Sequence, residues 1–240
     1  MPRFFVDPTA IGDTCIQLDP ETLAHIRVLR LGPNETVIIS DRAGVDYRCA
    51  LVGDQAEICT QFKNRAEPAV QATVYLGLTR GERMDYAVQK SVELGAIAIR
   101  LFSADRCVVR YDEKGLTKKI ARWEKVALEA AKQSGRGVVP TVAATPDFRS
   151  AMLDAAKADC PLFFYENEVQ QSFREVLQRR IGFRTISLVI GPEGGFTEEE
   201  AALAIEEYGL DSVSLGPRIL RAETAPVAAL AAVMFFAGDM

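Results

Sequence analysis

Short runs of alternating hydrophobic and polar residues occupy much of the first 68 positions, a pattern typical of β-strands. Strands are expected at 14–18, 35–40, 46–52 and 56–62. One helix interrupts them, because Asp19-Pro20-Glu21 is a start signal and apolar residues follow at helical spacing as far as Leu31. Mostly short strands in so few residues predict a small barrel, which ends at the polar, proline-terminated segment 64–68.

From residue 70 the pattern changes to alternating strands and helices. Apolar, β-rich runs predict strands at 70–78, 97–102, 138–143, 161–165, 185–190 and 212–215. Helices are expected at 82–94 and 115–134, each followed by a glycine, and at about 147–157, 169–180, 197–208 and 225–237. This alternation predicts an α/β domain over residues 69–240, with a largely parallel sheet and ligands beyond the carboxyl ends of its strands.

The last expected helix, at 225–237, is apolar on every side, so it must be covered on every side. A second subunit could supply part of that cover. This run is also the longest apolar stretch, and it is shorter than the roughly 18–20 residues of a membrane span. The N-terminus has no signal-peptide pattern. We therefore expect a soluble, cytoplasmic protein with no membrane partner.

Composition and charge change this picture only locally. Hydrophobic residues make up 48% and charged residues 25% of the chain, and the formal net charge is −5, which excludes a global basic signal for nucleic acid. Residues 69–140 hold 13 Lys and Arg against 8 Asp and Glu, so they indicate either a local anionic partner or a solvated helix face. Five scattered cysteines without a C-x-x-C pair, and a single histidine, suggest neither a disulfide framework nor a metal site.

The candidate chemistry begins at Gly191-Pro192-Glu193-Gly194-Gly195, the first loop, which follows an apolar strand and opens a helix. It lacks the lysine of a Walker loop and the spacing of a dinucleotide fingerprint. The helix start at 197–200 carries three glutamates, and Thr197 with Glu200 fits a capping box. A phosphate at this helix start would meet carboxylates. The first loop is therefore either a glycine turn before a well-capped helix or a close backbone approach to a ligand other than polyphosphate.

A second loop, residues 216–223, repeats this design. It follows the strand at 212–215, begins with Gly216-Pro217 and leads into the apolar last helix, where Pro226 is at home in a first turn.

Together the two loops resemble the paired signature of the ribosomal RNA small-subunit methyltransferase E family, in the stretches LVIGPEGGFTEEE (188–200) and LGPRILRAETAP (215–226). Three upstream stretches agree with it: HIRVLRLGP (25–33), RGERMDYAVQKSVELG (80–95) and RWEKVALEAAKQSGR (122–136). The resemblance implies a SPOUT-class domain with a deep trefoil knot at 69–240, a PUA-like barrel that helps to hold RNA at 1–68, and a homodimer. It also implies methyl transfer from S-adenosylmethionine to N3 of a uridine in the decoding region of 16S rRNA.

S-adenosylmethionine carries a sulfonium cation and no phosphate, so it suits a glycine loop that is followed by carboxylates. On the resemblance, the two loops and the loop after the strand at 161–165 surround the cofactor, with Glu166 toward the ribose hydroxyls. The expected cofactor-binding residues are Tyr165, Glu166, Ile190, Gly191, Pro192, Glu193, Gly194, Gly195, Leu215, Gly216, Ile219 and Leu220.

Two residues of the second loop are candidates for catalysis. The proton on uridine N3 must leave, so we expect Glu223 to accept it and Arg221 to stabilise the developing negative charge. The alternatives are that Glu223 caps the last helix and that Arg221 contacts a phosphate from the neighbouring subunit. For RNA contacts we expect arginines, which pair with phosphates in a bidentate manner: Arg3, Arg27, Arg30, Arg106 and Arg136.

Two other functions remain open from the sequence. One is a catalytically silent RNA-binding protein of the ribosome, and the other is a nucleotide-using α/β enzyme, against which the acidic helix start argues. The substrate is either 16S rRNA itself or the assembled small ribosomal subunit.

Overall fold

The computed structural model describes residues 1–168 and 171–240, which divide into two compact units. The first unit comprises Met1–Glu67 and Leu128–Val139, and the second comprises Pro68–Ala127 and Pro140–Met240. The expected boundary after residue 68 lies one residue from this division. The sequence did not indicate that a later segment, Leu128–Val139, would join the first unit.

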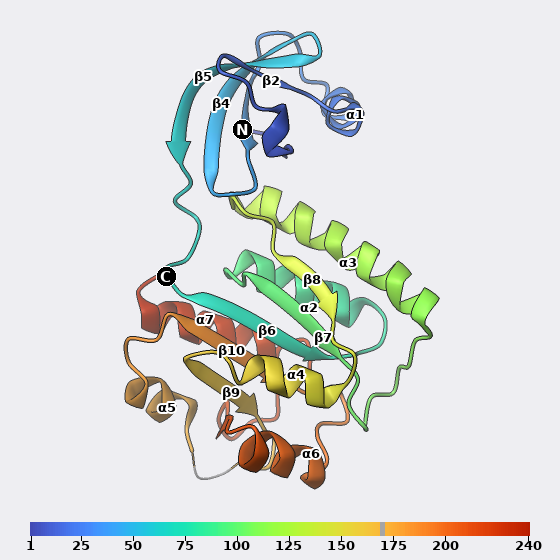
Figure 1. The fold of residues 1–240 in the computed structure, drawn as a ribbon, viewed down its shortest axis with the longest axis vertical. Coiled ribbons are helices and arrows are strands. Elements are labelled where there is room, and N and C mark those ends of the chain that lie inside the picture. Colours follow the sequence, from blue (N-terminus) through green and yellow to red (C-terminus); the bar gives the residue numbers. More distant parts are fainter. Residues whose placement is uncertain (169–170) are drawn as a thin grey trace. The chain divides into compact units, whose positions relative to one another are not determined.

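The first unit is built on a five-stranded sheet around an apolar core (Figure 1). Its strand order is β1 (Arg3–Phe5), β3 (Thr36–Ser40), β4 (Val45–Val52), β5 (Gln55–Lys63) and β2 (Cys15–Gln17). A short 3-10 turn, η1 (Pro8–Ala10), and helix α1 (Pro20–Val28) complete it. Ile16, Val37 and Ile39 are fully buried in its core. The four predicted strands and the helix are present, and strand β1 was not predicted.

Polar contacts help to explain why the segment Leu128–Val139, which includes the end of α3 (Glu113–Ser134), belongs to the first unit. The Arg136 guanidinium is 1% exposed and pairs with the Glu67 carboxylate at 2.7 Å. That carboxylate also accepts hydrogen bonds from the backbone of Gly137 and Val138. Asn64 donates to the Gly135 carbonyl at 2.9 Å. A few side chains of the segment 64–67 therefore satisfy the backbone and charge of residues 135–138.

The second unit has a six-stranded sheet in which every pairing is parallel. The strand order is β11 (Asp211–Val213), β9 (Cys160–Phe164), β10 (Thr185–Ile190), β6 (Gln71–Gly77), β7 (Ala98–Phe102) and β8 (Thr141–Ala144). The predicted α/β organisation with a largely parallel sheet is therefore confirmed. Strands β9 and β10 are almost wholly buried, as expected for strands covered on both faces.

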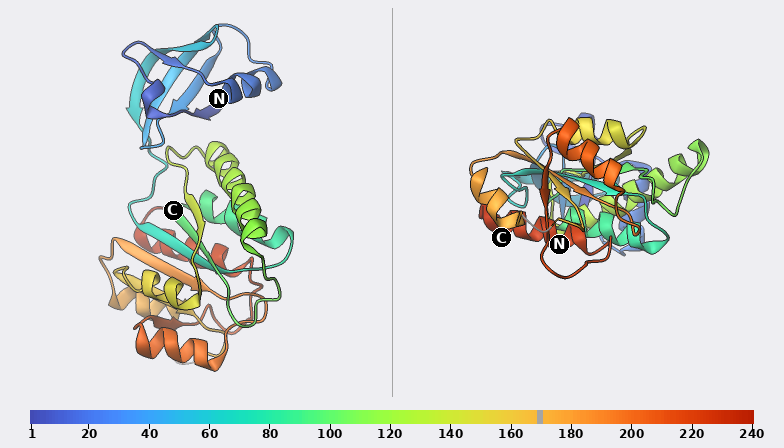
Figure 2. Two further views of the ribbon diagram at one scale, coloured as in Figure 1. Left: turned by 45° about the vertical axis from the view of Figure 1, so that its right-hand side comes forward. Right: turned by 90° about the horizontal axis from the view of Figure 1, so that it is seen from below.

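Helices cover both faces of this sheet. Figure 2 shows α4 (Phe148–Ala155) and α6 (Glu198–Ala202) on one face and α2 (Glu82–Glu93) and α7 (Ala225–Ala237) on the other. A single π turn, η2 (Leu203–Glu207), continues α6 and was not predicted. Helix α5 (Phe173–Arg179) replaces the helix expected at 169–180, whose residues 169–170 lie outside the described residues.

The cover of α7 within this chain is incomplete, so the part of the expected cover that a second subunit could supply stays a prediction. Ala229, Leu230 and Val233 are fully buried, whereas Phe235 is 75% exposed. The helix packs on α2 and β10 with one face and leaves another face to solvent. None of the helices in 1–168 and 171–240 has both the length and the apolar character needed to cross a membrane.

Candidate functional site

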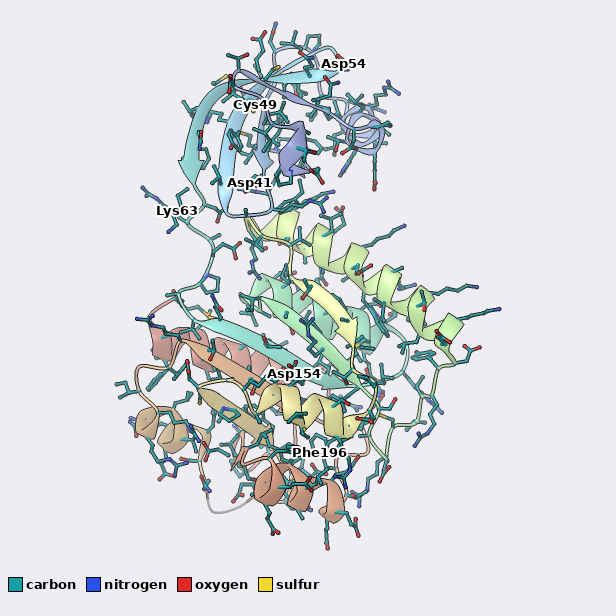
Figure 3. All side chains as sticks on the ribbon, in the orientation of Figure 1. Asp41, Cys49, Asp54, Lys63, Asp154 and Phe196 are labelled. Atoms are coloured by element: carbon teal, nitrogen blue, oxygen red, sulfur yellow. The ribbon has the colours of Figure 1, made fainter. Side chains whose placement is uncertain are left out.

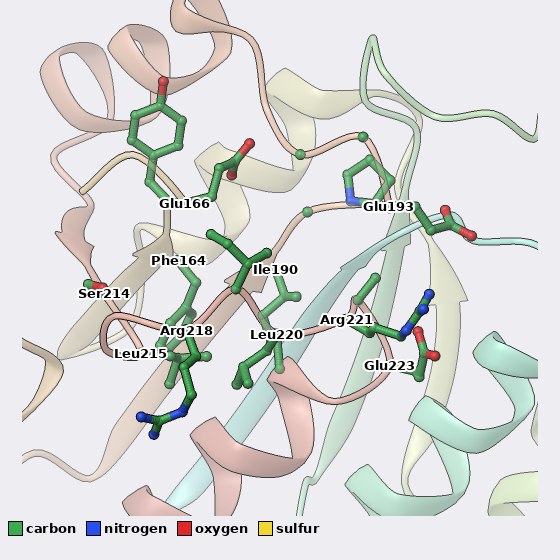
Figure 4. A pocket seen from close by; sticks show the side chains of 18 of the residues that line it. Phe164, Glu166, Ile190, Glu193, Ser214, Leu215, Arg218, Leu220, Arg221 and Glu223 are labelled. Carbon is green, nitrogen blue, oxygen red and sulfur yellow. The ribbon is translucent and has the colours of Figure 1, made fainter. Parts of the chain in front are cut away.

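A pocket of about 360 Å³ lies where the carboxyl ends of β9, β10 and β11 meet (Figure 4). Its walls are residues 164–166 after β9, the first loop after β10 and residues 213–223 after β11, with Arg83 of α2 and Ala225 of α7 at its margin. Every residue predicted to bind the cofactor or to act in catalysis lines this one pocket: Tyr165, Glu166, Ile190, Gly191, Pro192, Glu193, Gly194, Gly195, Leu215, Gly216, Ile219, Leu220, Arg221 and Glu223.

Glycines in the first loop allow backbone and side chains to approach one another closely. Gly195 has a φ of 67°, and a Cβ there would lie 1.7 Å from the Glu166 carboxylate. A Cβ on Gly194 would lie 2.8 Å from Arg106. At the end of β6, a Cβ on Gly77 would lie 2.6 Å from the Pro192 ring. The first loop thus packs closely against Glu166, Arg106 and Gly77, and these contacts restrict its backbone.

The Glu166 carboxylate helps to hold the first loop in this conformation. Its Oε1 accepts a hydrogen bond from the Phe196 N–H at 3.2 Å. Phe196, which Figure 3 labels, is 1% exposed, and its ring centroid lies 4.3 Å from that of Phe163. The rings of Phe102 and Phe148 also contact it. The Glu166 side chain is otherwise exposed to the pocket.

Helix α6 begins with the predicted capping box, which the structure confirms. The Thr197 hydroxyl accepts from the Glu200 N–H, and the Glu200 carboxylate accepts from the Thr197 N–H. The other Glu200 oxygen accepts from the Asp105 N–H at 2.8 Å, and the residue is 7% exposed. The three glutamates were expected to face the ligand, and this was wrong: residues 198–200 do not line the pocket, because the buried Phe196 separates the first loop from the start of α6.

The carboxylates that do line the pocket are Glu166, Glu193 and Glu223, with Glu166 at one end and the other two at the opposite end (Figure 4). The Arg83 Nη1 donates to Glu193 Oε1 at 2.9 Å, and the Arg83 Nε lies 3.9 Å from Glu223 Oε1. Burial raises the pKa of the Glu193 carboxyl, but hydrogen bonds from the Arg80 N–H and from Arg83 outweigh it, so its pKa lies below the usual value.

Two carboxylate oxygens in the pocket lack hydrogen-bond partners. Glu193 Oε2 and Glu223 Oε2 are buried and receive no hydrogen bond from any described residue. Buried acceptors of this kind are rare and call for a partner, since leaving one unsatisfied costs about 1–3 kcal/mol. The N-cap residue of α7, Thr224, also makes no side-chain cap. The free Glu223 oxygen therefore does not cap α7, and it has no other hydrogen-bond partner among the described residues.

Two arginines of the second loop, Arg218 and Arg221, are exposed and form no ion pair with any residue that the structure describes. Gly216 has a φ of 103°, and its N–H donates to the Ser214 hydroxyl at 3.2 Å. The second loop thus turns sharply at its start and offers free cationic groups beside the pocket.

The five arginines predicted to contact RNA fall into two groups. Arg27, Arg30 and Arg106 are exposed, and Arg106 donates to the Gly194 carbonyl at 3.4 Å. Arg3 and Arg136 are instead largely buried and ion-paired, with Asp46 and Glu67 respectively. A guanidinium enclosed in this way has no face for a phosphate, so the structure speaks against these two as RNA contacts.

The sequence reasoning missed several pocket residues, above all Arg83. It lies on α2, more than 100 positions before either carboxylate that it contacts, within the stretch 80–95 that agrees with the family but was given no role in the site. The others are Phe164, Val213, Ser214, Arg218, Ala222 and Ala225. Each of these other residues lies within two positions of a predicted site residue in the chain.

Known proteins resemble this chain over nearly its whole length. Residues 66–234 match a family model described as an RNA methyltransferase domain. A ribosomal RNA small subunit methyltransferase E of Bacillus subtilis is 33% identical, over 98% of this chain and 96% of the relative. One of Mycobacterium bovis is 30% identical, over 96% and 90%.

Solved structures agree with these relatives. A ribosomal RNA small subunit methyltransferase E of Neisseria gonorrhoeae, crystallised bound to S-adenosyl methionine, has a TM-score of 0.85 and 33% identity, covering 98% of this chain and 97% of that chain. A methyltransferase of Legionella pneumophila, solved with bound S-adenosylmethionine, has a TM-score of 0.85 and 27% identity, covering 97% and 96%. The family match and these similarities lead to one conclusion: the chain belongs to the ribosomal RNA small subunit methyltransferase E family.

Proposed function

We propose that the chain methylates N3 of a uridine in the decoding region of 16S rRNA, with S-adenosylmethionine as methyl donor. The observation that carries this proposal is one pocket in which two loops, two unpartnered carboxylate oxygens and a free arginine meet. The family and the S-adenosylmethionine-bound structures of similar proteins support the donor and the rRNA substrate class.

The pocket residues fit S-adenosylmethionine. The volume of about 360 Å³ falls within the range of small-molecule sites. Glycines at 191, 194, 195 and 216 line it, and backbone groups of the two loops would hold the adenine edge. The carboxylates of Glu193 and Glu223 bring negative charge to the end of the pocket that lies opposite Glu166, which suits a donor that is cationic and lacks phosphate. Glu166 would contact the ribose with the oxygen not bound to Phe196.

The chemistry needs a proton acceptor and a cation beside the target base. S-adenosylmethionine supplies an activated methyl group on a sulfonium. Glu223 accepts the N3 proton on its free oxygen Oε2, and Arg221 stabilises the negative charge that develops on the uracil oxygens. The pocket positions both reactants, and positioning supplies much of the rate of such a displacement.

We also propose the domain types, the RNA contacts and the homodimer that the family resemblance implies. The five-stranded sheet of the first unit forms the PUA-like barrel, and the second unit is the SPOUT domain with its trefoil knot. After β11 at the edge of the sheet, the chain returns through α7 to pack on β10, a path compatible with threading. The exposed arginines Arg27, Arg30 and Arg106 contact the RNA. The protein acts as a cytoplasmic homodimer, with the open face of α7 at the interface.

The experiment is methylation of small ribosomal subunits, or of naked 16S rRNA, that lack this modification, followed by mass mapping of the product. We expect one methyl group on N3 of a uridine in the decoding region. A methyl group on cytosine, on ribose or in transfer RNA would refute the proposed site. Binding of the subunit without any methyl transfer would favour a silent RNA-binding protein instead.

The role of Glu223 is tested by Glu223→Gln in single-turnover methylation. Loss of the general base is expected to slow transfer on the order of 100-fold, which exceeds the loss of S-adenosylmethionine affinity caused by removing one of the two negative charges. The control is Glu198→Gln, an exposed glutamate outside the pocket. A near-normal rate for Glu223→Gln would remove the assignment of the base.

A further inference from the structure

Arg83 connects the two loops of the pocket through their carboxylates. Its Nη1 bonds to Glu193 of the first loop at 2.9 Å, and its Nε lies 3.9 Å from Glu223 of the second. No other ion pair among the described residues involves either glutamate. The guanidinium belongs to α2, which packs against α7, so it is anchored outside both loops.

Each contact leaves one carboxylate oxygen free in a consistent way. On both Glu193 and Glu223, Oε1 is the oxygen near Arg83 and Oε2 is buried without a partner. Glu193 Oε1 also accepts the Arg80 N–H at 3.1 Å, so two donors fix its orientation. Arg83 thus contacts only the near oxygens of the two carboxylates.

The arrangement also places two like charges beside one cation. Without Arg83, two partly buried carboxylates, 20% and 19% exposed, would repel each other at the same end of the pocket. Removing the guanidinium is therefore expected to let both loops move apart.

We propose that Arg83 is a positioning residue, which ties the first loop to the second and so holds Glu223 Oε2 where it meets the target base. This inference rests on the proposed function for its role in the reaction. It assigns Arg83 the two glutamates as its partners, through Nη1 and Nε.

The test compares Arg83→Met and Arg83→Lys with a matched control, Arg80→Met. Arg80 is exposed and contacts Glu193 only through its backbone N–H, which the substitution retains. We expect Arg83→Met to lower the single-turnover rate on the order of 100-fold, as misplacement of a reacting group by about 1 Å does. The dissociation constant for S-adenosylmethionine should change much less, Arg83→Lys should recover part of the rate, and Arg80→Met should match the wild type.

A double-mutant cycle separates positioning from general support of the fold. If Arg83 acts through Glu223, Arg83→Met will add little to the loss already caused by Glu223→Gln. Additive losses, or an Arg83→Met variant as active as Arg80→Met, would overturn the proposal. If the wild type methylates no uridine, the proposed function fails first.

A measurement independent of activity keeps the two failures apart. Amide hydrogen exchange in residues 191–195 and 216–223 should be roughly tenfold faster in Arg83→Met, as expected for loss of a charge-assisted hydrogen bond, while the sheet is unchanged. Arg80→Met should exchange like the wild type. Unchanged exchange in both loops would contradict the tie between them, whatever reaction the pocket carries out.

Discussion

At the scale of single residues, Gly195 sits in a backbone conformation with a φ of 67°, and the Glu166 carboxylate occupies the space where a side chain would be. That carboxylate in turn accepts the N–H of the next residue, Phe196. The conformation of the first loop therefore depends on the absence of one carbon atom. This requirement is separate from the general preference of glycine for turns, because it involves a specific neighbour.

We predict that Gly195→Ala weakens S-adenosylmethionine binding on the order of 100-fold, because the new methyl group displaces Glu166 and the loop with it. The control is Gly182→Ala, which has a φ of 93° and open space around the added carbon. Both variants should lose about 1–3 kcal/mol of stability from backbone strain. Calorimetric titration and thermal unfolding separate the two effects, and equal affinities in the two variants would contradict the prediction.

Single residues also mark the limit of sequence reasoning. The glycines and Glu223, which the family resemblance indicated, do line the pocket, and the role of Glu223 as proton acceptor stays a prediction. Arg136 was misassigned because its partner, Glu67, is 69 positions away and no local pattern reveals that the ion pair is buried. Arg83 was missed because its partners, Glu193 and Glu223, are also distant in the sequence and come close to it only in the folded protein.

At the scale of elements, the start of α6 fastens the first loop to the sheet. Glu200 accepts hydrogen bonds from the backbone of Thr197, at the helix start, and of Asp105, in the segment after β7. The Glu200 carboxylate therefore binds backbone N–H groups, and Glu200 does not line the pocket. The sequence predicted the capping box correctly, whereas the contact with Asp105 depends on how β7 and β10 are arranged, which a local pattern does not contain.

We predict that Glu200→Ala lowers the free energy of unfolding by about 3 kcal/mol, because two backbone N–H groups lose their acceptor. Glu198→Ala, at an exposed position of the same turn, should change it by no more than about 0.5 kcal/mol. Urea unfolding of both variants measures the difference. Similar losses in the two would mean that Glu200 acts only as one of several helix-start charges.

At the scale of the whole molecule, the order of strands in the second unit could not be read from the alternation of strands and helices. Alternation indicates parallel pairing, but it does not place β9 between β10 and β11. That placement brings residues 164–166, 190–195 and 213–223 to one edge of the sheet and so creates the pocket. The site residues themselves came from the family resemblance, which carries this arrangement with it.

The exposed face of α7 leads to a prediction about assembly. If this face is the proposed dimer interface, Phe235→Asp should convert a dimer into a monomer, because a charge cannot be buried unpaired in an apolar interface. The control is Val28→Asp, which is 77% exposed in the first unit. Light scattering after size exclusion reports both masses. A Phe235→Asp variant that stays dimeric would place the interface elsewhere.

The order in which the pocket is assembled along the chain has a consequence for biosynthesis. The second loop and the edge strand β11 that precedes it are made after nearly all of the other described residues. A nascent polypeptide that ends before residue 211 lacks one whole wall of the pocket, however well the earlier strands have paired. The methyl donor can therefore stabilise the fold by binding only late in translation. Fragments that end before residue 211, whether from proteolysis or from stalled synthesis, lack this site and are not stabilised by the donor.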